Sequence, residues 1–151
     1  MIRLSKSADY GLMAMRHLSL MPQGCCCSAR EIAEDHGIPQ ALLAKLMQRL
    51  ARHGLVSATH GIKGGYRIAR PAQSISLREV IEAIEGPLAM TDCLHPESDR
   101  CAQDRTCTVK RPLLDLQARI AALLGETSLR DFGAAPKAQP MRIATPPRRH
   151  A

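Results

Sequence analysis

Two amphipathic segments joined at a glycine limit the possible folds of this chain more than any other part of its sequence. Residues 29–36 follow Ser28, and Glu31 completes a capping box three residues later, so they are predicted to form a short helix. After Gly37, apolar residues repeat at helical spacing from Pro39 to His53, with Pro39 expected at the first helical position. Two helices joined by a glycine-centred turn are typical of a helix-turn-helix.

A glycine-rich hairpin is predicted directly after the second helix. Residues 55–58 and 66–69 are predicted to be short strands on either side of a turn at His60–Gly65. A hairpin in this position is the wing of a winged helix-turn-helix domain. Apolar periodicity predicts further helices over residues 6–21, over 77–85, and from 109 or 112 to 125, with a last helical turn within 127–132.

The composition favours a mainly α-helical protein with little sheet, because aromatic residues are almost absent and good helix formers such as Leu and Ala replace them. No apolar run approaches the roughly 20 residues that cross a bilayer. The N-terminus does not read as a signal peptide, so we expect a cytoplasmic protein without a membrane partner. The expected organisation is a winged-helix DNA-binding domain over 1–72, a connecting helix over 73–87, a cysteine-rich loop over 88–108, a long helix over 109–133 and a disordered basic tail over 134–151.

The basic residues are concentrated in the N-terminal half. Residues 1–70 carry ten Lys and Arg against four acidic residues, whereas residues 71–133 carry seven against ten. A basic domain of this fold predicts double-stranded DNA as partner; a solvated charged face and a winged helix that binds protein are the alternatives. The predicted contacts are Gln40, Ala41 and Lys45 at bases, Arg49 and Arg52 at phosphates, Gln48 on the same helix face, and His60, Lys63 and Arg67 on the wing.

The six cysteines fall into two groups. Cys25–Cys27 is a consecutive run that cannot comfortably face one metal, and we interpret it as local drift in composition. Cys93, Cys101 and Cys107 lie in a polar loop and lack the tight C-x2-C pairs that favour zinc. Three thiolates on a loop supply most of the ligands of an iron–sulfur cluster, which needs four or a substitute. The second group is therefore predicted to hold a [2Fe-2S] or [4Fe-4S] cluster.

The sequence resembles the Rrf-two-type family of winged-helix transcription regulators over residues 1–133. The matching segments are residues 3–10, 31–34, 42–46, 54–56, 61–66 and 81–86, together with the three downstream cysteines. Residues 86–93 are most similar to the branch that regulates SUF-type iron–sulfur assembly genes.

The resemblance implies a homodimer in which the helix of residues 109–133 serves as the dimerisation helix and crosses to the partner subunit. The stripe of Leu113, Leu116, Ile120 and Leu123 fits this, because an amphipathic helix needs a surface to cover its apolar face. Packing of that stripe on its own domain is the alternative.

The resemblance also implies a fourth cluster ligand. In one branch of the family a His three residues after the last Cys serves, but this chain has Lys110 there. In another branch an Asp of the first helix serves from across the dimer, and Asp9 matches that position. His36, His95, a small molecule or water are the alternatives, and Asp9 is equally compatible with a plain surface or capping role.

The sequence lacks the patterns of an enzyme. It contains no nucleophile elbow, P-loop, dinucleotide fingerprint or paired catalytic carboxylates. The predicted function is a DNA-binding transcriptional regulator, by family default a repressor, that senses iron–sulfur cluster status, redox or nitric oxide stress and controls SUF-type genes. The alternatives are a thiol-based or ligand-controlled regulator without a cluster, and a loop that binds structural zinc.

Overall fold

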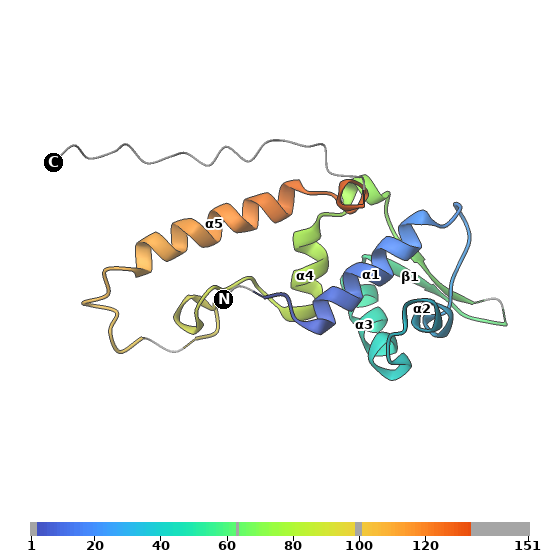
Figure 1. Cartoon of the computed structure of the whole chain (residues 1–151), viewed down its shortest axis with the longest axis horizontal. Helices are drawn as coiled ribbons and strands as arrows, with labels where there is room; N and C mark the ends of the chain where they lie inside the picture. The colour runs from blue at the N-terminus through green and yellow to red at the C-terminus, as the bar shows by residue number, and fades with distance from the viewer. Residues whose placement is uncertain (1–2, 63, 99–100, 134–151) are drawn as a thin grey trace.

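The structure is a computed structural model that describes residues 3–62, 64–98 and 101–133. The other helices and the wing pack together into one body, and one long helix extends from it (Figure 1). The expected fold class, a mainly α winged helix with a two-stranded wing and a long C-terminal helix, is confirmed. The elements are α1 (Lys6–Leu20), α2 (Ala29–His36), α3 (Gln40–Arg52), β1 (Val56–Thr59), β2 (Gly65–Ile68), the 3-10 helix η1 (Ala72–Ser74), α4 (Leu77–Glu85), the 3-10 helix η2 (Asp92–Leu94), α5 (Lys110–Glu126) and α6 (Leu129–Phe132).

Local sequence signals determine where the helix-turn-helix begins and ends. The capping box is present: the Glu31 amide donates to Ser28 Oγ at 3.2 Å, and the Ser28 amide donates to Glu31 Oε2 at 2.7 Å. Gly37 ends α2 in the left-handed conformation, with φ of 64°. Pro39 differs from expectation, since it is the N-cap residue and α3 begins at Gln40.

The core lies where α1 crosses α4 and packs on α3. Its largest fully buried side chains come from nearly every element of the body: Met15, Ile32, Leu43, Leu46, Met47, Leu50, Leu55, Ile75, Val80 and Leu129. Leu129 was not anticipated as a core residue. The α6 segment returns to the body because the Leu129 amide donates to the Ile75 carbonyl at 2.8 Å and the Leu77 amide donates to the Thr127 carbonyl at 3.0 Å. Burial of Leu129 then fixes the segment that follows α5 onto the body.

The cysteine run anchors the wing along the outer edge of β2. Strands β1 and β2 pair antiparallel, with Val56 opposite Ile68 and Thr59 opposite Gly65. On the side of β2 that faces away from β1, the Cys27 amide donates to the Tyr66 carbonyl at 3.0 Å, and the Tyr66 amide donates to the Cys27 carbonyl at 2.7 Å. The wing therefore has a third, very short partner that sequence periodicity did not indicate.

Gly65→Ala is expected to weaken this anchor. An alanine Cβ at Gly65 would lie 2.7 Å from the carbonyl carbon and oxygen of Cys27, which are backbone atoms and cannot rotate away. We expect a loss of about 1–3 kcal/mol in the free energy of unfolding, as for other overpacked sites. Chemical denaturation measures it, and Gly125→Ala is the matched control because a Cβ there meets no atom within 4 Å. Equal stability of the two variants would contradict the packing described here.

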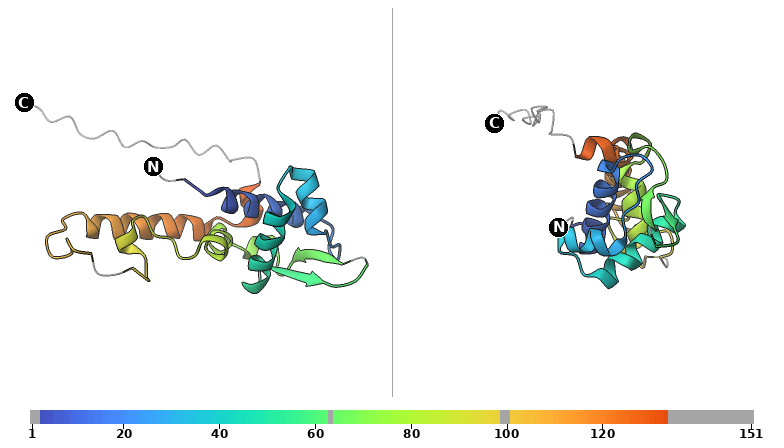
Figure 2. Two further views of the ribbon diagram at one scale, coloured as in Figure 1. Left: turned by 90° about the horizontal axis from the view of Figure 1, so that it is seen from below. Right: turned by 90° about the vertical axis from the view of Figure 1, so that its right-hand side faces the viewer.

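Helix α5 leaves the body and carries the cysteine loop at its far end (Figure 1; Figure 2, left). None of its residues is buried, and Leu116 and Leu123 are 43% and 64% exposed. The helix runs one residue beyond the expected end at Gly125. No helix of the described ranges is long and apolar enough to span a bilayer. The expected disordered tail over 134–151 lies outside the described residues.

Candidate DNA interface and cysteine loop

The outer face of α3 is where the candidate base contacts lie. Its inner face is buried through Leu43, Leu46, Met47 and Leu50, which recur at the helical period. That burial turns the intervening positions to solvent, and they are exposed: Gln40, Ala41, Lys45, Gln48 and Arg52. The helix thus presents amide and basic side chains together on one accessible surface, as the sequence predicted, and this surface is suited to contacts with base edges and phosphates.

Arg49 differs from the other predicted DNA contacts. Its Nη1 donates to the Ile84 carbonyl at 2.9 Å, near the C-terminus of α4. A cation at a helix C-terminus is stabilised by the unpaired carbonyls there. Arg49 therefore links α3 to α4, and this contact between segments 35 residues apart was not visible in the sequence.

The wing presents the second set of predicted contacts. His60 and Arg67 are both exposed. The Arg67 Nε donates to Ser57 Oγ at 3.1 Å, and the two residues face each other across the hairpin register. Lys63, predicted to contact DNA, lies outside the described residues.

The three predicted cluster cysteines lie on the loop between α4 and α5, each with intermediate burial. Cys93 is in η2, and its Sγ lies 3.3 Å from Thr91 Oγ1. The Cys101 Sγ lies 3.4 Å from Gln103 Oε1. In residues 3–62, 64–98 and 101–133, no three His, Cys, Asp or Glu side chains are grouped closely enough to hold a metal ion. The sequence predicts that the three thiols hold one cluster. In this conformation the described residues do not form a site that is ready to bind it.

The predicted fourth ligand, Asp9, is in the first turn of α1. Its Oδ2 lies 3.2 Å from Lys6 Nζ, and its side chain is about half exposed. Of the alternative ligands, His36 pairs with His17, with 3.1 Å between Nε2 and Nδ1, and His95 Nδ1 accepts from the Glu97 amide at 3.2 Å. Asp9 is thus available on the surface, but it is not grouped with the cysteines within the described chain.

Lys110 supplies positive charge to the loop. Its ammonium group donates to Asp104, and this hydrogen bond, with the charge of Asp104, raises the pKa of Lys110. The charges of Cys93 and Cys101 contribute to the same upward shift. Lys110 therefore adds a positive charge to the loop that carries the cysteines.

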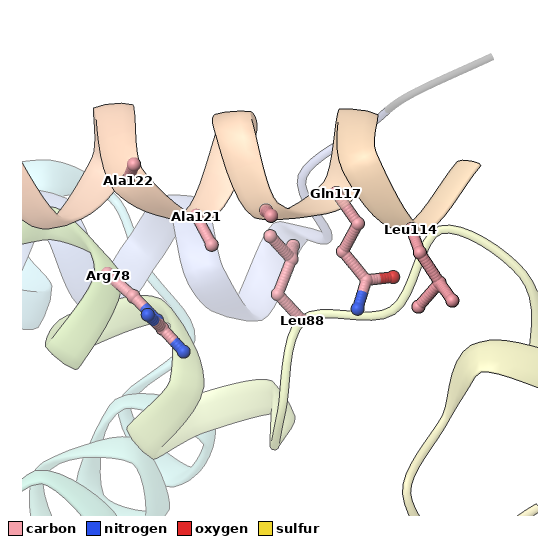
Figure 3. A pocket seen from close by; sticks show the side chains of 7 residues that line it. Arg78, Leu88, Leu114, Gln117, Ala121 and Ala122 are labelled. Atoms are coloured by element: carbon pink, nitrogen blue, oxygen red, sulfur yellow. The ribbon is translucent and has the colours of Figure 1, made fainter. Parts of the chain in front are cut away.

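The segment between α4 and the cysteines is attached to α5. The Met90 amide donates to Gln117 Oε1 at 3.0 Å. Leu88 lies under α5 beside Gln117 and Leu114, where the two segments enclose a cavity of about 400 Å³ (Figure 3). Direct contacts therefore join the segment before Cys93 to α5.

The three residues of the run Cys25–Cys27 differ in burial. Cys27 is 7% exposed and belongs to the core, whereas Cys25 is exposed and Cys26 is half-buried. Burial of the Cys27 thiol, together with the neighbouring Glu31 carboxylate, raises its pKa to about 11. Sequence spacing did not separate these roles, because only the pairing of Cys27 with β2 turns its side chain inward.

Cys27 is expected to be the slowest cysteine to alkylate. At pH 8 a thiol of pKa about 11 has an about hundredfold smaller thiolate fraction than one at the ordinary 9.0, and only the thiolate reacts. Timed iodoacetamide labelling followed by peptide mass spectrometry ranks the six cysteines, with Cys25 as the adjacent control. Labelling of Cys27 as fast as Cys25 would contradict its burial.

Comparisons with known proteins give a family match for the chain and several solved structures of similar fold. Residues 4–135 match the family model Rrf2, described as iron-dependent transcriptional regulator. T. potens IscR is 25% identical, with a TM-score of 0.68 over 87% of this chain and 85% of that one. The oxidized form of Staphylococcus aureus CymR is 27% identical, with a TM-score of 0.67 over 89% and 98%. CymR of B. subtilis, described as its global cysteine regulator, is 23% identical, with a TM-score of 0.70 over 87% and 96%.

Members of this family are DNA-binding transcriptional regulators and not enzymes. The family match covers nearly all of the described residues, and the helix-turn-helix, wing and C-terminal helix agree with it. The chain belongs to the Rrf2 family of transcriptional regulators.

Proposed function

We propose that this regulator represses SUF-type iron–sulfur assembly genes and that an iron–sulfur cluster on Cys93, Cys101 and Cys107 controls its binding to DNA. The observation that carries the proposal is the position of these thiols: all three lie on one loop that is bonded to α5 and kept apart from the core. The proposed place of action is the cytoplasm. The family description of iron dependence supports the cluster part of the proposal.

The donor chemistry of the loop fits a cluster. Cysteine thiolates are the usual ligands of [2Fe-2S] and [4Fe-4S] centres, and Lys110 offsets their negative charge. When bound, the cluster supplies a redox-sensitive and chemically labile crosslink for the loop. The cysteines hold it, and Asp9 of the partner subunit is our proposed fourth ligand, since this chain has Lys110 at the position of the histidine in the other ligand pattern.

The proposed dimer connects the loop to DNA. Two protomers pair through the exposed apolar side of α5, so that two α3 helices reach successive half-sites of a double-stranded operator. Helix α5 contacts the loop through Gln117 and follows α4, which Arg49 joins to α3. Rearrangement of the loop is thus expected to change the relative placement of the two recognition helices, and with it the affinity for DNA.

Arg52→Gln is expected to weaken binding to all duplexes by a similar factor. A phosphate contact carries no sequence information, so its loss lowers the slope of log K against log salt by about 0.9 per contact. Fluorescence anisotropy at several salt concentrations measures the slope on specific and random DNA. Arg105→Gln, exposed on the cysteine loop, is the control of equal charge. An unchanged slope in Arg52→Gln would remove this residue from the interface.

The iron and sulfide content of the purified protein tests directly whether it binds an iron–sulfur cluster. Protein purified without oxygen is expected to be brown and to contain matched amounts of iron and acid-labile sulfide. A Cys93→Ala, Cys101→Ala, Cys107→Ala variant is expected to be colourless while keeping its helical circular dichroism, because none of the three thiols is in the core. Colourless wild-type protein after reconstitution, with zinc or without metal, would refute the cluster.

A thiol switch without a cluster is the second candidate. The three sulfurs are partly accessible and have no shared metal geometry in this conformation, and the S. aureus CymR of similar fold is described in an oxidized form. Under this alternative, oxidant changes DNA affinity in protein free of iron. Iron and sulfide analysis separates the two candidates.

A further inference from the structure

A large cavity away from the cysteine loop's attachment to α5 has no role in the function proposed above. It has a volume of about 910 Å³ and opens where the C-terminal end of α1, the following turn, the base of the wing and α6 meet. It is separate from the cysteine loop and from the outer face of α3, because residues of neither line it.

Four arginines from four different parts of the fold line this cavity: Arg16 of α1, Arg67 of β2, Arg70 after the wing and Arg130 of α6. None of the described lining residues is acidic. Within the described chain only Arg70 of the four forms a salt bridge, to Glu79 at 2.7 Å. Arg16 donates to the Gly133 carbonyl at 3.1 Å and Arg67 to Ser57 Oγ, both neutral acceptors. Residues 134–151 add four basic side chains and no acidic one, so they bring no carboxylate side chain to offset this charge.

Like charges that line one concave surface raise the local positive potential, and an anion bound there relieves their repulsion. Guanidinium groups bind carboxylates and phosphates through paired N–H donors, so more than one anionic group can be accommodated. The walls also include apolar side chains from Leu18, Leu20, Met21 and Ile68, and Leu20 is 67% exposed. A concave, part-apolar site is suited to a small molecule.

We propose that this cavity binds a small organic anion that carries at least two negative charges and a compact apolar part. Arg16 and Arg130 hold the anionic groups, because neither is committed to a carboxylate in the described structure. Arg67 and Ile68 belong to β2, so the bound molecule touches the base of the wing. The site gives the regulator a second input that does not depend on the cysteines.

Three probes test the site in the full-length protein: citrate, pyrophosphate and phenyl phosphate, each against potassium chloride at equal ionic strength. Calorimetry is expected to give saturable binding of at least one probe, with a raised unfolding midpoint as expected for a native-state ligand. Citrate alone identifies a carboxylate site, and the phosphate probes identify a phosphate site.

Arg16→Gln/Arg130→Gln is expected to weaken binding about tenfold or more, since two charged hydrogen-bonding groups are lost. The single variant Arg130→Gln, at an exposed position, gives a partial loss and guards against misfolding of the double variant. Arg30→Gln/Arg111→Gln removes the same charge at exposed positions that do not line the cavity and should bind as wild type. Binding of no probe, or equal loss in both double variants, would overturn the proposal. Reduced operator affinity in Arg16→Gln/Arg130→Gln without any anion binding would overturn it too, and would assign these arginines to DNA.

Discussion

Replacing Gln40 and Lys45 by alanine is expected to lower the affinity for a specific operator at least about a hundredfold. Both side chains are exposed at the N-terminal half of α3, whose inner face holds the helix rigidly in the core. A good base contact contributes about 1–3 kcal/mol, and a dimer makes each contact twice. Because neither side chain is buried, the free energy of unfolding should change little, and denaturation measures it alongside DNA binding.

The operator for this experiment is obtained by selecting, from random duplex DNA, the sequences that the wild-type protein binds. Affinity for unrelated duplexes should fall much less than affinity for the selected one, since base contacts carry the discrimination. Arg111→Ala, which removes a charge from the exposed start of α5, is the control and should leave the ratio of specific to random affinity unchanged. If the Gln40→Ala/Lys45→Ala variant keeps that ratio, α3 is not the reading helix.

Replacing Leu116 and Leu123 by glutamate is expected to convert the protein to monomers at micromolar concentration. These leucines are 43% and 64% exposed on a helix that has no buried residue, and they lie on one side of it. Burial of a leucine contributes about 1.5–3 kcal/mol, and a two-fold interface counts each residue twice. Their loss therefore weakens a dimer by about four orders of magnitude or more. Sedimentation velocity measures the change.

The matched control places two glutamates on the opposite side of the same helix. Arg111 and Gly125 are exposed and do not line the cavity beside Leu88, and a Cβ at Gly125 meets no atom within 4 Å. Arg111→Glu/Gly125→Glu should remain dimeric and bind the operator as wild type. A wild-type protein that sediments as a monomer, or equal dissociation of both variants, would contradict pairing through the Leu116 and Leu123 side.

The parts of the fold that follow from local rules could be predicted from the sequence. The capping box at Ser28, the glycine that ends α2 and the apolar period of α3 each act within a few residues, so pattern alone located them. The solvent-facing side of α3 followed from the same period.

Contacts between distant segments could not be predicted in this way. Leu129 is a core residue because α6 pairs with the residues before α4, and Cys27 is inward because it pairs with Tyr66. Arg49 was assigned to DNA phosphate from its helix face, and this stays a prediction; its hydrogen bond to the Ile84 carbonyl was not indicated by that face. Each outcome depends on tertiary packing, which periodicity does not encode. The cluster ligands stay a prediction, because the three thiols lie on one loop but do not form a metal site in the described residues.

Operator affinity with and without the cluster shows whether the cluster controls DNA binding. The same protein preparation is measured by anisotropy without oxygen, before and after removal of iron by a chelator, beside the Cys93→Ala, Cys101→Ala, Cys107→Ala variant. We expect removal of the cluster to change wild-type affinity by about 5–150-fold, the usual range of coupling between sites, and to leave the affinity of the variant unchanged. Wild-type affinity that is the same in both states would contradict control of DNA binding by a cluster on this loop.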